Sequence, residues 1–203
     1  SAYTYTVTGS DADGDTITMT GTTVPSWLSF DASTGVLSGT PLNANVGTSG
    51  NDVVITLSDG NGGSVTDSFT ITVANTNDAP TISSTAITTA EEDDVYTYTA
   101  VGADVDAGDV LTLQGTTVPS WLTFTASTGV LTGTPANADV GTHSVTITVT
   151  DAAGATGSQS FTITVNNAND APSITSTAIT SVDEDSAYSY TVTTSDPDAG
   201  DTV

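Results

Sequence analysis

The sequence Val145-Thr146-Ile147-Thr148-Val149-Thr150 alternates branched apolar residues with threonine. The same alternation recurs at 161–165, and similar stretches occur at 54–57 and 70–73. Successive side chains of a strand point to opposite faces of a sheet, so alternation rich in β-branched residues predicts half-buried antiparallel strands. No window of the sequence has helical periodicity. We therefore predict an all-β protein.

These predicted strands belong to a tandem repeat. Tyr3-Thr4-Tyr5 returns at 96–98, an offset of 96 − 3 = 93, and Val24-Pro25-Ser26-Trp27-Leu28 returns at 118–122, an offset of 118 − 24 = 94. Gly-rich sequences such as Asp59-Gly60-Asn61-Gly62-Gly63 supply hairpin turns. Short strands at turn-marked intervals in a unit of about 93 residues predict a Greek-key β-sandwich.

The repeat predicts three parts of the chain. Residues 1–78 form a repeat that lacks its first strand, residues 79–171 form a complete repeat, and residues 172–203 form the truncated start of a third. We expect the sequence to be an excerpt of a longer array, in which residues 172–203 cannot fold alone.

The composition excludes several classes of function. The chain has 24 acidic residues and no lysine or arginine, for a formal charge of −24. Nucleic-acid binding and anionic membrane surfaces both need basic residues, so neither is expected. Cysteine is absent, and no apolar run approaches the roughly 18 residues that span a membrane. Abundant hard oxygen ligands without thiolates point to calcium as the cofactor.

Two kinds of polar segment recur at fixed spacing. Asn75-Thr76-Asn77-Asp78-Ala79-Pro80 returns as a linker at 166–172, and each linker proline precedes an acidic loop by 24 residues (104 − 80 and 196 − 172). The loops are Asp104-Val105-Asp106-Ala107-Gly108-Asp109 and Asp196-Pro197-Asp198-Ala199-Gly200-Asp201. A solvated turn is the simpler interpretation of one such loop. Recurrence in an equivalent context favours metal binding, and we expect linkers and loops to meet at domain boundaries.

The ordered series of motifs resembles cadherin-type repeats, in particular the bacterial cadherin-like group related to dystroglycan-type and putative immunoglobulin-like repeats. The D-x-D loop at Asp104 and Asp106, the hairpin at 122–131 with its Thr-Gly-Val-Leu turn, the strand at 147–151 and the final strand with its N-D-x-P linker at 161–172 occur in the family's order. The resemblance covers nearly the whole chain.

The resemblance implies calcium between consecutive repeats, held by residues that match the family's ligands. The first junction would use the linker residues Asn75, Asn77 and Asp78 with Asp104, Asp106 and Asp151. The second would use Glu92 (or Glu91), Asp139, Asn169 and Asp170 with Asp196 and Asp198. Asp11, Asp13 and Asp59 would face a preceding repeat.

The predicted function is a calcium-stiffened spacer of an extracellular, secreted or cell-surface bacterial adhesin or surface fibre. Its partners would be neighbouring repeats of the same chain. Two alternatives remain open: a carbohydrate-binding module that uses Trp27 and Trp121, and a self-assembling filament in which a neighbouring chain donates a strand from residues 173–185.

Other candidate residues have simpler roles. Trp27 and Trp121 precede predicted strands and are expected in the core. Tyr96 and Tyr98 lie on one face of a strand, where core or cross-strand packing is expected. His143 has no serine and carboxylate recurring around it, so we expect an exposed residue at a strand edge. The paired carboxylates recur in every unit, whereas an active site is usually single, and an enzyme is not expected.

Overall fold

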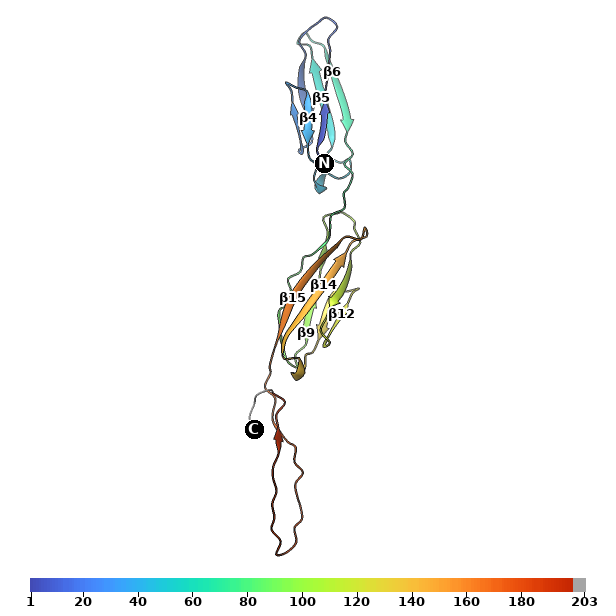
Figure 1. Ribbon diagram of the computed structural model, residues 1–203. Helices are drawn as coiled ribbons and strands as arrows, with labels where there is room; N and C mark the ends of the chain where they lie inside the picture. The colour runs from blue at the N-terminus through green and yellow to red at the C-terminus, as the bar shows by residue number, and fades with distance from the viewer. Residues whose placement is uncertain (199–203) are drawn as a thin grey trace. The chain divides into compact units, whose positions relative to one another are not determined.

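The computed structural model describes residues 1–198 of the chain. These residues form strands, turns and two short 3-10 helices without an α-helix, which confirms the all-β class (Figure 1). No helix among them is long and apolar enough to cross a membrane. The chain divides into two compact units, Ser1–Asp78 and Ala79–Val203. The division into three repeats stays a prediction, and Asp201 of the third acidic loop lies outside the described residues.

The second unit contains two main sheets. One has the strand order β11-β14-β15-β8, in which β8 runs parallel to β15 and the other pairs are antiparallel. The other has the order β12-β13-β9 and is antiparallel. The strands of the first sheet are β8 (Thr89–Glu91), β11 (Thr112–Thr117), β14 (Gly141–Thr150) and β15 (Thr156–Asn166). Those of the second sheet are β9 (Tyr96–Thr99), β12 (Leu122–Thr125) and β13 (Val130–Gly133), and a short pair joins β7 (Thr81–Ile82) to β10 (Gly102–Ala103).

The core of this unit follows the alternation in the sequence. Val145, Ile147 and Val149 are fully buried, while the threonines between them are half-buried on the opposite face of β14. The strand therefore contributes one apolar face, and each side chain removed from water stabilises the fold by about 1.5–3 kcal/mol. Tyr96 and Tyr98 are also buried, as predicted.

The first unit repeats most of this arrangement. Its two sheets have the orders β1-β4-β3 and β2-β5-β6. The strands are β1 (Tyr3–Thr6), β2 (Thr18–Thr23), β3 (Leu28–Asp31), β4 (Val36–Gly39), β5 (Asp52–Ser58) and β6 (Ser64–Thr70). Leu37, Val53 and Ile55 are fully buried in its core.

One predicted strand of the first unit is shorter than expected. The alternation at 70–73 predicts a strand, but β6 ends at Thr70 and Val73 makes only an isolated bridge to Gly47. In the second unit β15 continues to Asn166, because β8 pairs with its last residues. Among the described residues of the first unit, no strand pairs with 71–73 in the way that β8 pairs with the end of β15.

The two tryptophans, predicted in the core, are partly buried and pack against the cores of their units, and His143 corrects a prediction. His143 is half-buried and not exposed as predicted, in the first part of β14, where the strand pairs with β15 and the pairing with β11 has not yet begun. Its ring meets the Trp121 ring edge-on, with centroids 5.8 Å apart, and its Nε2 atom lies 2.6 Å from the Asp139 carbonyl oxygen. The imidazole thus fills space beside the indole.

The C-terminal part of the second unit contains little regular structure. A single two-residue pair joins β16 (Ser173–Ile174) to β17 (Thr194–Ser195), and residues 175–193 between them form no strand. Two hydrogen-bonded tyrosines, Tyr188 and Tyr190, still reproduce contacts made by Tyr96 and Tyr98.

Candidate metal centres

The first candidate centre is the acidic loop that follows β10. Carboxylate oxygens of Asp104, Asp106 and Asp109 all lie within 4.8 Å of one another. The backbone N–H of Asp106 donates to Asp104 Oδ1 at 2.8 Å, which curls the loop into an Asx turn. Asp106 is only 4 % exposed. The loop therefore gathers three carboxylates in a partly buried position.

Asp151 adds a fourth negative charge to this group. It is buried in the turn after β14, where its Oδ1 accepts a hydrogen bond of 2.7 Å from the Ala155 backbone N–H. Desolvation raises the pKa of Asp109 above its ordinary value, and the charges of Asp104, Asp151 and Asp106 raise it further. A raised carboxyl pKa means that the charged form is disfavoured where it stands.

Two oxygens of this group need a partner. Asp104 Oδ2 and Asp109 Oδ2 are buried and accept no hydrogen bond within the described part of the chain. Buried carboxylate oxygens are normally paired, and the sequence contains no lysine or arginine to pair them. A bound cation would satisfy them, and carboxylates on a flexible loop are the donor set that calcium prefers.

The second candidate centre lies where β8 and β15 end. Carboxylate oxygens of Glu92, Asp93 and Asp170 lie within 4.8 Å of one another. Glu92 is buried, and its Oε2 accepts a hydrogen bond of 3.3 Å from the backbone N–H of Ala168. Asp93 has a φ of 62°, so the chain turns sharply after the buried glutamate. Three carboxylates again converge without a basic side chain.

The D-x-D loop near the C-terminus meets this second group. The backbone N–H of Asp170 donates to Asp198 Oδ2 at 2.7 Å. The Asn137 side-chain amide lies between the two acids, with Nδ2 3.4 Å from Asp170 Oδ2 and 3.5 Å from Asp198 Oδ1. Asp198 is buried, so a fourth carboxylate joins the group.

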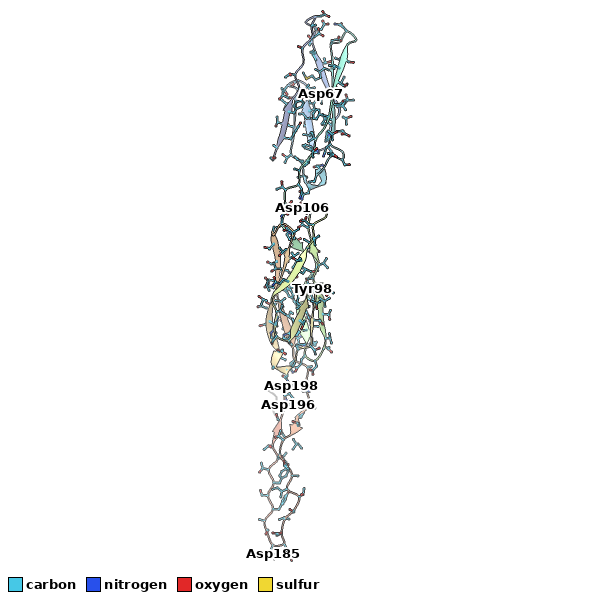
Figure 2. The ribbon with its side chains drawn as sticks, turned by 90° about the vertical axis from the view of Figure 1, so that its right-hand side faces the viewer. Asp67, Tyr98, Asp106, Asp185, Asp196 and Asp198 are labelled. Carbon is cyan, nitrogen blue, oxygen red and sulfur yellow. The ribbon has the colours of Figure 1, made fainter. Side chains whose placement is uncertain are left out.

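The two centres lie at opposite ends of the second unit's main sheet. β14 and β15 pair antiparallel from Gly141↔Val165 to Thr150↔Thr156, so Asp151 follows one end of the pair and Asp170 follows the other. A ten-residue strand spans roughly 30 Å. Figure 2 shows Asp106 at one end, Asp196 and Asp198 at the other, and Tyr98 between them.

A family model described as "Putative Ig domain" matches the chain twice, at residues 1–74 and 79–166. The chain belongs to this Ig-domain family. No curated protein matches it. Among solved structures, the protocadherin γB4 extracellular domain is 19 % identical with a TM-score of 0.56, and covers 94 % of this chain and 35 % of its own. Protocadherin γB7 extracellular cadherin domains 1–4 are 16 % identical with a TM-score of 0.53, covering 98 % of this chain and 51 % of theirs.

These likenesses confirm the predicted cadherin-like and immunoglobulin-like fold. An endo-fucoidan hydrolase of glycoside hydrolase family 107 is 30 % identical with a TM-score of 0.40, over 83 % of this chain and 26 % of its own. The Ig-family chain thus spans about a quarter to a half of the length of these structures.

Some of the predicted calcium ligands of this Ig-family chain lie at the two centres, and others lie outside them. Six of them lie in or beside the two centres: Asp104, Asp106, Asp151, Glu92, Asp170 and Asp198. The predicted alternative Glu91 instead accepts a hydrogen bond from the Asn166 side chain at 2.7 Å. Asp139 lies outside both three-carboxylate groups, and its Oδ2 accepts the Ala136 backbone N–H at 3.0 Å in the 3-10 turn Asn137–Asp139.

Two further predicted ligands shape the chain beside the second centre. Asp196 Oδ1 accepts the Asp198 backbone N–H at 3.0 Å, which closes an Asx turn like that of Asp104 and Asp106. The Asn169 side chain donates to the Asp170 carbonyl oxygen at 2.8 Å.

The first unit contains the remaining predicted ligands. In its linker, Asp78 Oδ2 accepts a hydrogen bond of 2.9 Å from the Asn43 side chain, Asn77 donates to the Asp78 carbonyl oxygen, and Asn75 is exposed. At the other predicted site, Asp11 Oδ1 accepts the Asp13 backbone N–H, and Asp59 accepts those of Asn61 and Gly63. No group of three acidic residues within 4.8 Å forms there among the described residues.

Three residues at the centres were missed by sequence reasoning. Asp109 ends the acidic loop, and its recurrence at Asp15 and Asp201 was the available signal. Asn137 recurs as Asn43, which contacts Asp78 as Asn137 contacts Asp170. Asp93 recurs as Asp185, and both have a φ of 62°. Recurrence alone does not show where a side chain points, so the sequence could not assign them.

Proposed function

We propose that both acidic centres bind calcium and that the chain is a calcium-stiffened extender of an extracellular bacterial adhesin or surface fibre. One observation carries the proposal. Carboxylates gather at both ends of one Ig-family domain, in a chain without lysine or arginine. Surface charge alone would keep a protein soluble without placing carboxylate oxygens within 4.8 Å of each other.

Calcium fits these centres better than other common metals. It takes six to eight oxygen ligands at about 2.3–2.6 Å and tolerates irregular geometry. Asp104, Asp106, Asp109 and Asp151 would hold it at one end, and Glu92, Asp93, Asp170 and Asp198 at the other. Zinc prefers histidine and cysteine, and the chain has one histidine and no cysteine.

Calcium bound beside a linker would affect the stiffness of the chain. The second centre includes Asp170 from the linker and Asp198 from the segment beyond it, so an ion there would join parts on both sides of Pro172. Without an ion the like charges repel and favour separation. The extender would therefore be stiff with calcium and loose without it.

Isothermal titration calorimetry of the 203-residue chain tests the binding. We expect calcium binding at both centres, and Asp106→Asn should weaken the first by roughly ten-fold or more, because ligand charge tunes affinity. Asp183→Asn is the matched control, since it removes one charge from an exposed residue outside both centres. Equal calcium affinity in both variants would contradict the assignment of the first centre.

A further inference from the structure

The turn between β5 and β6 contains an asparagine that differs from all others in the chain. Of the ten asparagines in the sequence, only Asn61 is followed by glycine, at Gly62. The turn spans residues 59–63, and Asn61 is exposed. The corresponding turn of the second unit, at 151–155 (151 − 59 = 92), has exposed residues at 152–154 but no asparagine. An exposed Asn-Gly pair is thus confined to the first unit.

The hydrogen bonds of this turn leave the Gly62 nitrogen available. Asp59 Oδ1 accepts the backbone N–H of Asn61 at 2.7 Å and that of Gly63 at 2.9 Å. Within residues 1–198 the Gly62 N–H between them donates to no acceptor. Gly62 has a φ of 103°, and no atom lies within 4 Å of the place that a Cβ would take. Its nitrogen is therefore free to approach the Asn61 side chain.

We propose that Asn61 deamidates spontaneously through a succinimide, since asparagine is a thermolabile residue. The Gly62 nitrogen loses its proton and attacks Asn61 Cγ, so that an N–C bond forms, the Cγ–Nδ2 bond breaks and ammonia leaves with a proton. Water then adds to one of the two ring carbonyl carbons. Opening on the Cγ side gives aspartate, and opening on the main-chain side gives isoaspartate. Overall one water enters and one ammonia leaves.

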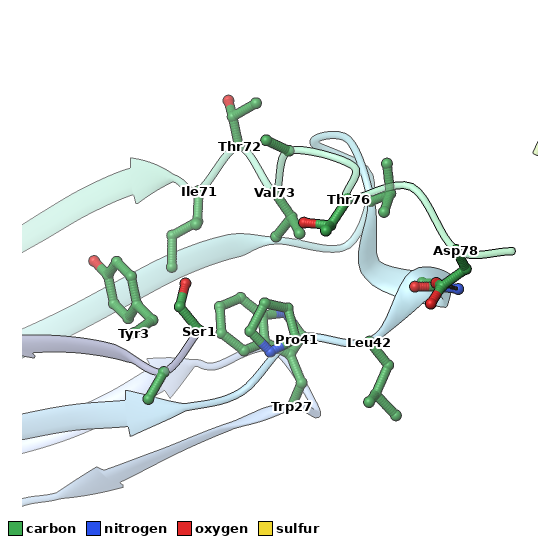
Figure 3. A pocket seen from close by; sticks show the side chains of 14 residues that line it. Ser1, Tyr3, Trp27, Pro41, Leu42, Ile71, Thr72, Val73, Thr76 and Asp78 are labelled. Atoms are coloured by element: carbon green, nitrogen blue, oxygen red, sulfur yellow. Dashed lines mark hydrogen bonds between the residues drawn. The ribbon is translucent and has the colours of Figure 1, made fainter. Parts of the chain in front are cut away.

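Asn43 provides a comparison within the same unit. The Asn61 side chain donates to Asp15 Oδ2 at 2.7 Å. The Asn43 side chain donates in the same way to Asp78 Oδ2, at 2.9 Å, beside the pocket shown in Figure 3. Both asparagines are exposed. Ala44 follows Asn43, however, and its Cβ crowds the nitrogen that would close the ring. The following glycine therefore distinguishes the reactive asparagine.

Two Asp-Gly pairs of the first unit can form the same ring, but more slowly. They are Asp13-Gly14 and Asp59-Gly60. An ionised carboxylate is a poorer electrophile than an amide, because its negative charge opposes attack on the carbon. Asp59 is also held by the two hydrogen bonds that it accepts within the turn. Asn61 should therefore react first.

Deamidation changes the contact between the turn and the loop at 11–15. The Asn61 amide donates to Asp15, which is half-buried. The product carries a carboxylate at position 61, so a donor and acceptor become two like charges in contact. The turn at 59–63 should then move away from Asp15. Because the reaction needs only water and time, the first unit gains negative charge as the protein ages.

Incubation of the 203-residue chain in neutral and in mildly alkaline buffer tests the proposal. Chymotrypsin cleaves after Leu57 and Phe69, and mass spectrometry of the peptide 58–69 measures conversion at Asn61. We expect Asn61 to convert before the other asparagines, faster in alkali, to a mixture of isoaspartate and aspartate. Gly62→Ala should slow conversion by roughly ten-fold or more, because a Cβ crowds the attacking nitrogen.

Asn61→Gln is the matched control for the ring. It keeps an amide at this exposed position, but attack by the next nitrogen would close a six-membered ring, so conversion should be slower than at Asn61. Both substitutions lie in the turn and outside the core of the first unit, so folding is preserved. Equal conversion of Asn61 and Asn43 would overturn the proposal. Equal rates in the parent chain and Gly62→Ala, or aspartate without isoaspartate, would overturn it too.

Asn61→Asp copies the aspartate product and tests the consequence for the turn. Thermal unfolding at low salt should show a lower melting temperature than that of Asn61→Gln, and added salt should narrow the difference, because salt screens exposed charges. Equal melting temperatures of the two variants at low salt would overturn the repulsion from Asp15. Neither measurement involves calcium, so failure of the proposed calcium sites would be seen separately, in calorimetry.

Discussion

Asp31 is the last residue of β3 and the first residue of the turn at 31–35. The corresponding turn of the second domain, at 125–129, has the same sequence except that Thr125 stands in place of Asp31. Asp31 Oδ1 accepts hydrogen bonds from Ser33 Oγ at 2.6 Å and from the Ser33 N–H at 2.9 Å. These bonds lower the pKa of Asp31 to about 2. A lowered folded-state pKa means that the charged carboxylate stabilises the fold above its ordinary pKa, and that this stabilisation is lost as the pH falls toward 2.

We predict that Asp31→Thr lowers the melting temperature of the first unit at pH 7 and that the difference shrinks as the pH falls toward 2. Thermal unfolding by circular dichroism at both pH values measures it. Ser29→Thr, an exposed change on the same strand, is the control and should show no such pH dependence. An Asp31→Thr effect of equal size at both pH values would contradict the assigned hydrogen bonds.

Asn51 is a buried residue whose role the sequence did not indicate. Its Oδ1 accepts the Trp27 indole N–H at 2.9 Å, and its Nδ2 donates to the carbonyl oxygens of Asn45 and Gly47 at 2.9 and 3.0 Å. His143 stands at the corresponding position (143 − 51 = 92), beside Trp121 and the Asp139 carbonyl oxygen. Both residues hold the 3-10 turn against the tryptophan.

We predict that Asn51→Ala destabilises the first unit by about 1–3 kcal/mol, because it removes the hydrogen-bond partner of the Trp27 indole N–H and of the Asn45 carbonyl oxygen, while the Gly47 carbonyl oxygen keeps the Val73 N–H. Asn51→His, which copies the second unit, should cost less. Urea unfolding followed by Trp27 fluorescence, with Trp121 replaced by phenylalanine in all variants, gives the difference. Equal stability of Asn51→Ala and the parent would contradict the role of the amide.

The sequence identified several acidic residues of the two centres, but it did not show how their side chains are arranged. The recurring D-x-D loops and linkers placed Asp104, Asp106 and Asp170 among the candidates, because spacing is visible in one dimension, and the family resemblance added Glu92. The environment of His143 depends on a partner 143 − 121 = 22 residues away in the sequence, and the pattern of one strand does not contain that information.

At the scale of elements, alternation predicted the strands wherever both neighbours were present. Val145, Ile147 and Val149 are buried as their period of two requires. The alternation at 70–73 is equally good, yet the strand ends at Thr70. A strand needs a hydrogen-bonded neighbour as well as a suitable pattern, and among the described residues no strand pairs with 71–73.

The glycine of the Thr132-Gly133-Thr134-Pro135 sequence, at the end of β13, is explained by close backbone contact. Strand β13 pairs with β12 and β9, and a Cβ on Gly133 would overlap the carbonyl oxygen of Trp121. Gly39 has the same relation to Trp27 in the first unit. Only glycine therefore fits where the hairpin passes the tryptophan backbone.

We predict that Gly133→Ala destabilises the second unit by about 1–3 kcal/mol or more, since overpacking against backbone cannot be relieved by a rotamer change. Gly102→Ala is the control and should cost less, because the added Cβ would meet side-chain atoms of Val149 and Leu111, at 3.0 and 3.1 Å, which can move more easily than backbone. Chemical denaturation of both variants measures the difference. A larger loss for Gly102→Ala would contradict the steric account.

At the scale of the whole molecule, repetition defines both the fold and the proposed function. Two matches to one family model cover residues 1–74 and 79–166, and the acidic centres stand at the ends of the second domain. The chain cannot neutralise those centres with its own side chains, because it has no lysine or arginine. Under the proposed function, a divalent cation at each centre would supply the missing charge.

Small-angle X-ray scattering of the 203-residue chain, in calcium and in a calcium chelator, tests this central claim most directly, with magnesium as the control. The account predicts a longer maximum dimension and a narrower distribution of conformations in calcium, and magnesium should not reproduce the change. The Asp106→Asn and Asp170→Asn double variant should scatter in calcium as the parent chain does in chelator. Superimposable profiles of the parent chain in calcium and in chelator would contradict calcium stiffening.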